Sequence, residues 1–139
     1  MKIGILTYHS VYNFGANLQA LSTVGYLKNY GFEPIIINWM PEDLETRYDR
    51  TIPLVQANVH KDFMKNFLPC SEICRTYIDI AQVIEKQNIK GIIIGSDAVL
   101  QHITLFSRIH LRKKGIIIGP KPGADVFYPN PFWGSFIPH

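Results

Sequence analysis

Three runs of consecutive isoleucines constrain the fold of this 139-residue chain more than any other feature of its sequence. They lie at residues 35–37, 92–94 and 116–118, and a fourth short apolar run spans Lys2–Thr7. Runs of this length that are apolar at every position are typical of strands buried on both faces, as in a parallel sheet covered by helices.

Helical patterns separate these runs. In Ala16–Tyr30 the apolar residues recur close to every 3.6 positions, and Gly31 follows where such a helix would end. A second strand is predicted over Glu33–Trp39. Residues 1–40 therefore form a strand, a loop, a helix and a strand, a unit that joins parallel strands by a right-handed crossover.

The rest of the chain extends this alternation. Residues 42–75 are more polar and mixed, with a helix predicted at Asn58–Leu68, and a further helix is predicted at Tyr77–Gln87. The string Gly91–Gly95 recurs as Gly115–Gly119, which we interpret as two equivalent strands of one sheet. The pattern predicts an α/β fold with a Rossmann-like parallel sheet and flanking helices.

Composition bounds the class of protein. Apolar residues make up 47% and charged residues 18% of the chain, which is the balance of a globular protein, and its length suits a single domain over residues 1–139. The net charge of +3 is too small for a dedicated nucleic-acid binder. The sequence contains no apolar run of membrane-spanning length and no recognisable signal peptide, and its two cysteines are too few for a disulfide scaffold, so we expect a cytoplasmic protein.

The first candidate site is the loop Tyr8–Ala16, between the first strand and the first helix. Ligands of open α/β sheets bind outside the carboxyl ends of the strands. Gly15 would let the backbone approach a ligand, and the helix N-terminus behind it favours an anionic group. Neither the dinucleotide fingerprint nor the Walker A pattern is present. The alternative is that Asn13 and Gly15 only form the turn and cap the helix.

The second candidate site follows the strand at 92–94. Asp97, after Gly95 and Ser96, could orient a substrate hydroxyl or accept its proton. The alternative is that Ser96 or Asp97 caps a helix. Because both loops follow strands of one parallel sheet, we expect Asn13, Gly15, Ser96 and Asp97 to converge on one pocket.

The remaining reactive side chains give weaker indications of a functional site. Cys70 and Cys74 have no nearby histidine pair, so we interpret them as buried or idle thiols and expect no metal site. We interpret His9 as a surface loop histidine in preference to an acid–base group. Residues 108–114 are interpreted as a solvated basic turn. The other histidines are scattered and indicate no metal: His60, His102, His110 and His139.

Three segments together resemble the polysaccharide pyruvyl transferase family. The first is Ile5–His9 with the string Asn-Phe-Gly-Ala-Asn-Leu-Gln-Ala at 13–20; the second is Ile-Ile-Gly-Ser-Asp at 93–97; the third is Asn-Pro-Phe-Trp-Gly-Ser-Phe at 130–136. Members of this family transfer pyruvyl from phosphoenolpyruvate to two sugar hydroxyls, forming a ketal on a glycan. Their fold is similar to that of GT-B glycosyltransferases, with two Rossmann-like domains facing a cleft.

The resemblance implies that this chain is the amino-terminal, acceptor-side domain of such an enzyme, truncated before the second domain. It implies a glycan or glycolipid acceptor, with phosphoenolpyruvate as co-substrate and no further cofactor. Phosphoenolpyruvate needs basic side chains, which in the family lie mainly in the second domain. Carried onto this sequence, Asp97 is the candidate catalytic residue. The candidate substrate-binding residues are Asn13, Gly15, Gln19, Gly95 and Ser96.

Two alternatives belong to other functional classes. Residues Val126–His139 contain five aromatic side chains and no charged one, which is typical of a segment that packs on a surface. The chain could thus be a non-catalytic association module that forms a homo-oligomer through this segment. It could also be a small nucleotide-binding protein with a flavodoxin-like sheet.

Overall fold

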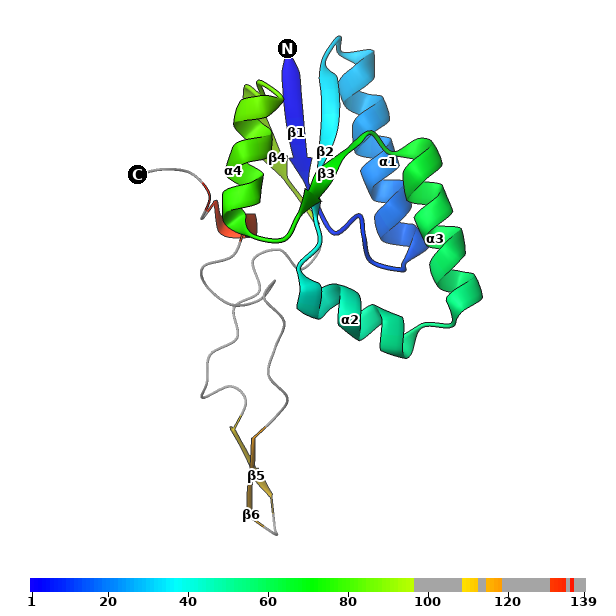
Figure 1. Ribbon diagram of the computed structural model, residues 1–139, viewed down its shortest axis with the longest axis vertical. Helices are drawn as coiled ribbons and strands as arrows, with labels where there is room; N and C mark the ends of the chain where they lie inside the picture. The colour runs from blue at the N-terminus through cyan, green and yellow to red at the C-terminus, as the bar shows by residue number, and fades with distance from the viewer. Residues whose placement is uncertain (97–108, 113–114, 119–130, 135, 137–139) are drawn as a thin grey trace.

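The computed structural model describes residues 1–96, 109–112, 115–118, 131–134 and 136 (Figure 1). Its elements, in chain order, are β1 Lys2–Leu6, α1 Phe14–Asn29, β2 Glu33–Trp39, α2 Glu42–Thr51, α3 Leu54–Phe67, β3 Cys70–Cys74, α4 Tyr77–Lys86, β4 Gly91–Ile94, β5 Ile109–Arg112, β6 Gly115–Ile118 and the 3₁₀ turn η2 Pro131–Trp133.

The central sheet has the order β3-β2-β1-β4, and all of its strand pairs are parallel. β1 pairs with β2 on one side, with Gly4 opposite Ile35, and with β4 on the other, with Gly4 opposite Ile92. The chain moves outward from β1 to β3 and then returns to the other side of β1. This order confirms the predicted Rossmann-like α/β arrangement and places a topological switch point between the carboxyl ends of β1 and β4.

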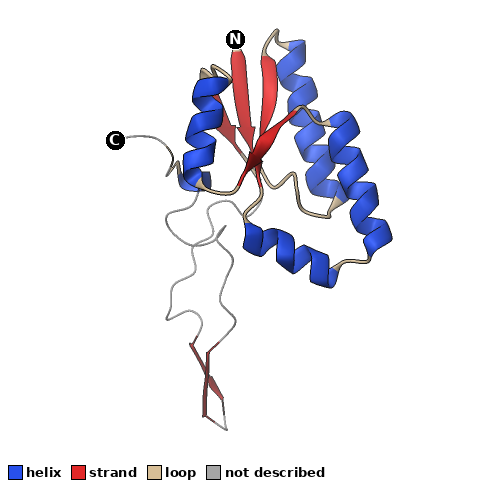
Figure 2. Ribbon diagram, in the orientation of Figure 1, coloured by secondary structure: helices blue, strands red, loops and turns tan. Residues whose placement is uncertain are grey.

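Helices cover the sheet on both faces, with α1 and α3 on one side and α4 on the other (Figure 2). The pleat of β1 divides its side chains between the two layers: Ile3 and Ile5 pack with α1, and Leu6 packs towards α4. The buried residues of the α1 layer are Ile3, Ile5, Ala20, Val24, Leu27, Ile36 and Leu68. Those of the α4 layer are Leu6, Ile37, Trp39, Cys74, Ile80, Val83, Ile89, Phe132 and Phe136.

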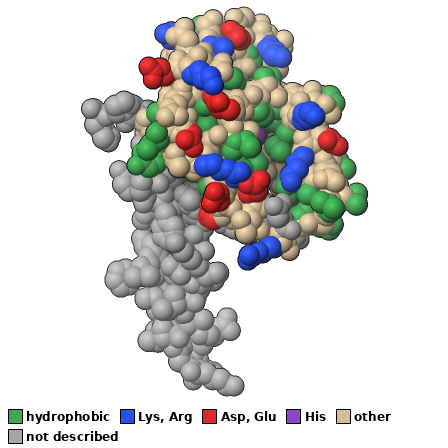
Figure 3. Space-filling view, in the orientation of Figure 1, with side chains coloured by type: hydrophobic (Ala, Val, Ile, Leu, Met, Phe, Trp, Pro, Cys, Tyr) green, Lys and Arg blue, Asp and Glu red, His purple; other side chains and the backbone are tan. Residues whose placement is uncertain are grey.

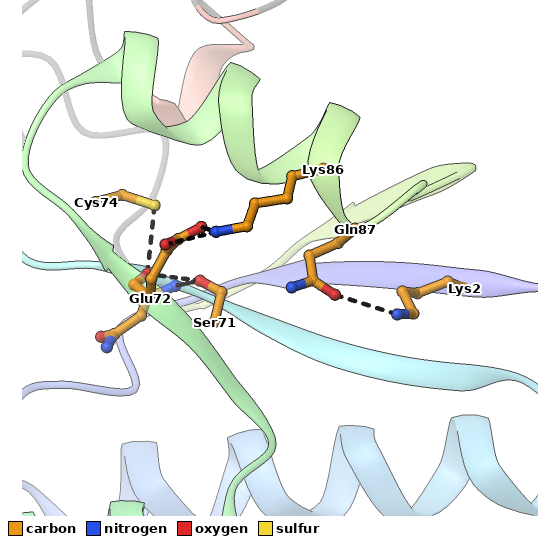
Figure 4. A network of polar contacts seen from close by, with 7 residues as sticks. Lys2, Ser71, Glu72, Cys74, Lys86 and Gln87 are labelled. Carbon is orange, nitrogen blue, oxygen red and sulfur yellow. Dashed lines mark hydrogen bonds and ion pairs between the residues drawn. The ribbon is translucent and has the colours of Figure 1, made fainter.

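Local sequence accounts for the limits of α4. Thr76 and Asp79 form a reciprocal capping box at its start, and Asn88 adopts the left-handed conformation (φ 53°) just beyond its end. Hydrogen bonds from the backbone N–H groups of Thr76 and Arg75 stabilise the Asp79 carboxylate and lower its pKa. Figure 4 shows the outer contact of this helix with β3, where the Lys86 ammonium lies 2.9 Å from a carboxylate oxygen of Glu72.

The structure corrects two predictions about the isoleucine runs. The strand at 116–118 does not join the main sheet, because β6 pairs antiparallel with β5 in a separate two-stranded sheet. The repeated string therefore forms non-equivalent strands. β4 is an edge strand, and Ile93 and Ile94 are 42% and 36% exposed, so this isoleucine run is not buried on both faces as predicted.

The region 42–75 holds more structure than predicted. It contains α2 and β3, which the mixed polar pattern did not indicate, and α3 begins at Leu54, before the predicted start at Asn58. The strand at Glu33–Trp39 is confirmed, and the helices predicted at Ala16–Tyr30 and Tyr77–Gln87 are confirmed with small shifts of their ends.

Basic and acidic side chains are interspersed over the face of the domain drawn in Figure 3. Within the described ranges, none of the helices combines the length and the apolar character needed to cross a bilayer.

Candidate functional site

An open pocket of about 590 Å³ lies at the carboxyl edge of the sheet, at the switch point between β1 and β4. The loop after β1 and the first turns of α1 form most of its wall, and Ser96, just after β4, contributes the rest. Its lining residues are Tyr8, Val11, Asn13, Gly15, Ala16, Gln19 and Ser96.

Four of the predicted site residues meet here. Asn13, Gly15, Gln19 and Ser96 all line the pocket, although Ser96 is far from the others in sequence. Gly95 does not appear in the wall; its backbone N–H donates a hydrogen bond to the Leu6 carbonyl at 3.2 Å, which continues the pairing of β4 with β1. Asp97 lies outside the described residues.

Asn13 has a structural role in addition to its place in the pocket. It is the N-cap of α1, and its side-chain oxygen accepts a hydrogen bond from the Gly15 N–H at 2.8 Å. A Cβ on Gly15 would lie 3.1 Å from this oxygen, so glycine permits the close approach. The capping interpretation of Asn13 and Gly15 is therefore confirmed, and it is compatible with ligand binding by the same residues.

The polar groups of the pocket wall are neutral. Gln19 projects from the second turn of α1, and its side-chain oxygen accepts a hydrogen bond from the buried Thr7 hydroxyl at 3.3 Å. Among the described lining residues there are amide, hydroxyl and phenol groups and no charged side chain.

An aromatic contact connects the pocket to the segment near the end of the sequence. The ring centroids of Tyr8 and Phe132 are 4.6 Å apart, and Phe132 and Phe136 are buried in the α4-side core. Of the five aromatic residues in Val126–His139, these two are thus covered by the same chain, and Trp133 is 42% exposed. Phe127 and Tyr128 lie outside the described residues.

A chain of buried polar side chains lies behind the pocket loop, and the sequence analysis missed it. His9 is fully buried, which corrects its interpretation as a surface histidine. Its ring nitrogens lie 3.1 Å from the Thr7 carbonyl oxygen and 3.0 Å from the side-chain oxygen of Asn38. Asn17 on α1 contacts both the His9 carbonyl and the ring of His60 on α3. The signal available in the sequence was the polar Asn17 at a position on the buried face of an amphipathic helix.

Burial lowers the pKa of both His9 and His60. For His9 the hydrogen bonds to Asn38 and Thr7 oppose this shift without reversing it.

Both cysteines are free thiols; Cys74 is buried and Cys70 is partly buried. Burial raises the pKa of Cys70 and of Cys74 to about 11, so neither is a thiolate at neutral pH. Across the described ranges, no group of three or more histidine, cysteine or acidic side chains is placed to hold a metal ion.

Comparisons with known proteins found no counterpart of this chain: no protein-family model, curated protein or solved structure matches it. A functional proposal therefore depends on the residues of this chain and their geometry.

Proposed function

We propose that this chain is the acceptor-side domain of a protein similar to polysaccharide pyruvyl transferases, and that its pocket holds a hydroxyl-bearing sugar of a glycan or glycolipid. One observation carries the proposal. The three segments that resemble the family are distant in sequence. Two of them line one pocket, through Asn13 and Gln19 and through Ser96, and Phe132 of the third packs against Tyr8, which also lines it.

The chemistry of the pocket wall supports the acceptor over the donor. A sugar offers several neutral hydroxyl groups, each able to donate and accept hydrogen bonds, and these match the amide of Gln19 and the hydroxyl of Ser96. Phosphoenolpyruvate carries a phosphate and a carboxylate, which require cationic side chains. In the proposal those cations come from the second domain that the resemblance implies.

Asp97 is proposed as the group that orients an acceptor hydroxyl or accepts its proton. It follows Ser96 directly in sequence, three residues after Ile94, the last residue of β4. A carboxylate at that position is the type of general base that hydroxyl attack on a pyruvyl donor requires.

The two alternative functions receive less support. Flavodoxin-like sheets have the order 2-1-3-4-5, whereas here β3 pairs with β2 and β4 pairs with β1. The association module depends on aromatic side chains that face a partner, and Phe132 and Phe136 are instead buried in their own domain.

Titration of the ¹⁵N-labelled chain tests the proposal. The ligands are methyl glycosides of glucose, galactose and mannose, with phosphoenolpyruvate and flavin mononucleotide as competitors of other chemistry. We expect a glycoside to bind, and Gln19→Ala to weaken that binding by about fivefold, as loss of one hydrogen bond would. Gln56→Ala, an exposed glutamine on α3, is the matched control and should bind as the unmodified protein does. Binding of flavin mononucleotide at this pocket, with no glycoside response, would contradict the proposal.

A further inference from the structure

The loop after β1 supplies most of the pocket wall, and buried polar contacts hold it from behind. Residues 7–13 of this loop contain Tyr8, Val11 and Asn13, which all line the pocket. Within the loop, the Asn13 N–H donates to the Val11 carbonyl at 2.7 Å. The other described anchors of the loop come from β2, α1 and α3, and they include the Trp39 carbonyl, which accepts a hydrogen bond from the Ser10 hydroxyl at 3.4 Å.

Asn17 makes three hydrogen bonds around this loop. It is fully buried, and its side-chain NH₂ donates to the His9 carbonyl at 2.6 Å. Its side-chain oxygen lies 2.7 Å from Nδ1 of His60, and its backbone N–H donates to the Asn13 carbonyl at 3.1 Å. One residue thus contacts the loop at two places and reaches across to α3.

The donors and acceptors fix the orientation of this amide. The His9 carbonyl can only accept, so the NH₂ of Asn17 must face it and the amide oxygen must face His60. His60 therefore carries its proton on Nδ1 and donates it to Asn17. The other ring nitrogen, Nε2, is buried without a hydrogen-bond partner among the described residues. The polar bond that His60 makes in the described part of the chain is thus the one that orients Asn17.

We infer that Asn17 is a positioning residue for the pocket: its carboxamide, oriented by His60, holds the His9 carbonyl so that the loop presents Asn13 and Gly15 to a ligand. The inference rests on the proposed function only in taking this pocket as the ligand site. The ring of His60 also packs against Tyr12 in the loop and against Phe14, with centroids 5.7 Å and 4.2 Å apart, so substitutions must separate the polar bond from these packing contacts.

Two substitutions of His60 make that separation. His60→Asn keeps a donor near the position of Nδ1 but removes the ring, and His60→Leu keeps apolar bulk but removes the donor. Asn17→Asp is the corresponding change at the other partner, since a carboxylate still accepts from His60 but cannot donate to the His9 carbonyl. Asn58→Asp, at an exposed position on α3, is its matched control.

The first measurement is amide hydrogen exchange in the unliganded protein. We expect Asn17→Asp and His60→Leu to speed exchange at the Asn13 and Gly15 amides by about tenfold relative to the amides of Val24 and Leu27 in α1, as loss of a buried hydrogen bond would. His60→Asn should keep the exchange of the loop within about threefold of the unmodified protein, and Asn58→Asp should match it. A merely structural role would instead speed exchange at all four amides by the same factor, or would make His60→Asn the more damaging substitution, and either result would overturn the inference.

The second measurement is glycoside binding by the same variants. Asn17→Asp should weaken binding at the pocket by about tenfold, and His60→Asn should retain it. Unchanged affinity in Asn17→Asp, with selectively faster loop exchange, would overturn the positioning role. If no glycoside binds even the unmodified protein, the proposed function fails, whereas the exchange measurement still decides whether Asn17 holds the loop.

Discussion

The two buried histidines predict how stability depends on pH. Burial lowers the pKa of His9 and of His60 in the folded state, while an unfolded histidine titrates near 6.5. Below that pH the unfolded chain therefore binds more protons than the folded one, so the free energy of unfolding falls as pH falls. The stability that these groups contribute is present above about pH 6.5 and is lost on acidification.

The size of the effect follows from proton linkage. If both rings stay neutral in the folded protein, lowering the pH from 7.5 to 5.5 costs at most about 1.4 kcal/mol for each histidine, and about 2.7 kcal/mol for the two. The pKa of Asp79 is also lowered. The stability that its carboxylate contributes is therefore present above about pH 4 and is lost as the pH falls below that value, separately from the histidines.

Urea unfolding at a series of pH values between 5.5 and 7.5 measures this dependence. At the acid end of this range, the slope of the free energy of unfolding against pH should correspond to an uptake of nearly two protons on unfolding. In His60→Asn that uptake should fall by one proton, whatever the change in absolute stability. His9→Gln provides the same comparison at the other ring. Stability that is constant or rises on acidification over this range would refute the neutral, buried state of these histidines.

Three further outcomes are expected. Gly4→Ala should destabilise the protein by about 1–3 kcal/mol in urea unfolding, because the new Cβ would lie 3.0 Å from Ile37 Cδ1 and 3.2 Å from Ile89 Cγ2 in a filled core. Gly25 lies in α1 with open space around it, so Gly25→Ala should instead stabilise the protein by about 0.5–1 kcal/mol. Thr76→Ala removes the capping box of α4 and should cost about 0.5–2 kcal/mol in the same assay, whereas Thr23→Ala, within α1, should cost less. Residues 1–139 alone should release no phosphate from phosphoenolpyruvate in the presence of glycosides, since the proposed function assigns donor binding to a second domain; steady turnover would contradict that assignment.

The strands and helices that carry strong apolar periodicity were predictable from the sequence. β1 and β2 are apolar at nearly every position because both of their faces are covered, and α1 ends where Gly31 takes a positive φ of 78°. β3 was not predictable, since Cys70–Cys74 holds polar side chains and lies at the edge of the sheet. The pairing of β6 with β5 could not be predicted from the sequence either, because Ile116–Ile118 has the same residues as Ile92–Ile94 in β4 and a local sequence does not specify which strand it pairs with.

The candidate site was predictable in part. The rule that ligands bind at the carboxyl ends of parallel strands brought Asn13 and Ser96 together correctly, because strand direction alone determines that edge. The burial of His9 was not predictable, since a histidine in a polar loop carries no local sign that Asn38 and Asn17 will enclose it. Buried polar contacts of this kind depend on tertiary structure, which a single sequence does not display.

Chemical-shift mapping of a methyl glycoside on the ¹⁵N-labelled protein tests most directly whether the pocket between β1 and β4 binds a sugar. The largest shifts should cluster at Asn13, Gly15, Gln19 and Ser96, at the carboxyl edge between β1 and β4. Shifts that instead gather at the opposite edge of the sheet, where Lys28 and Glu33 line a separate hollow, would contradict it.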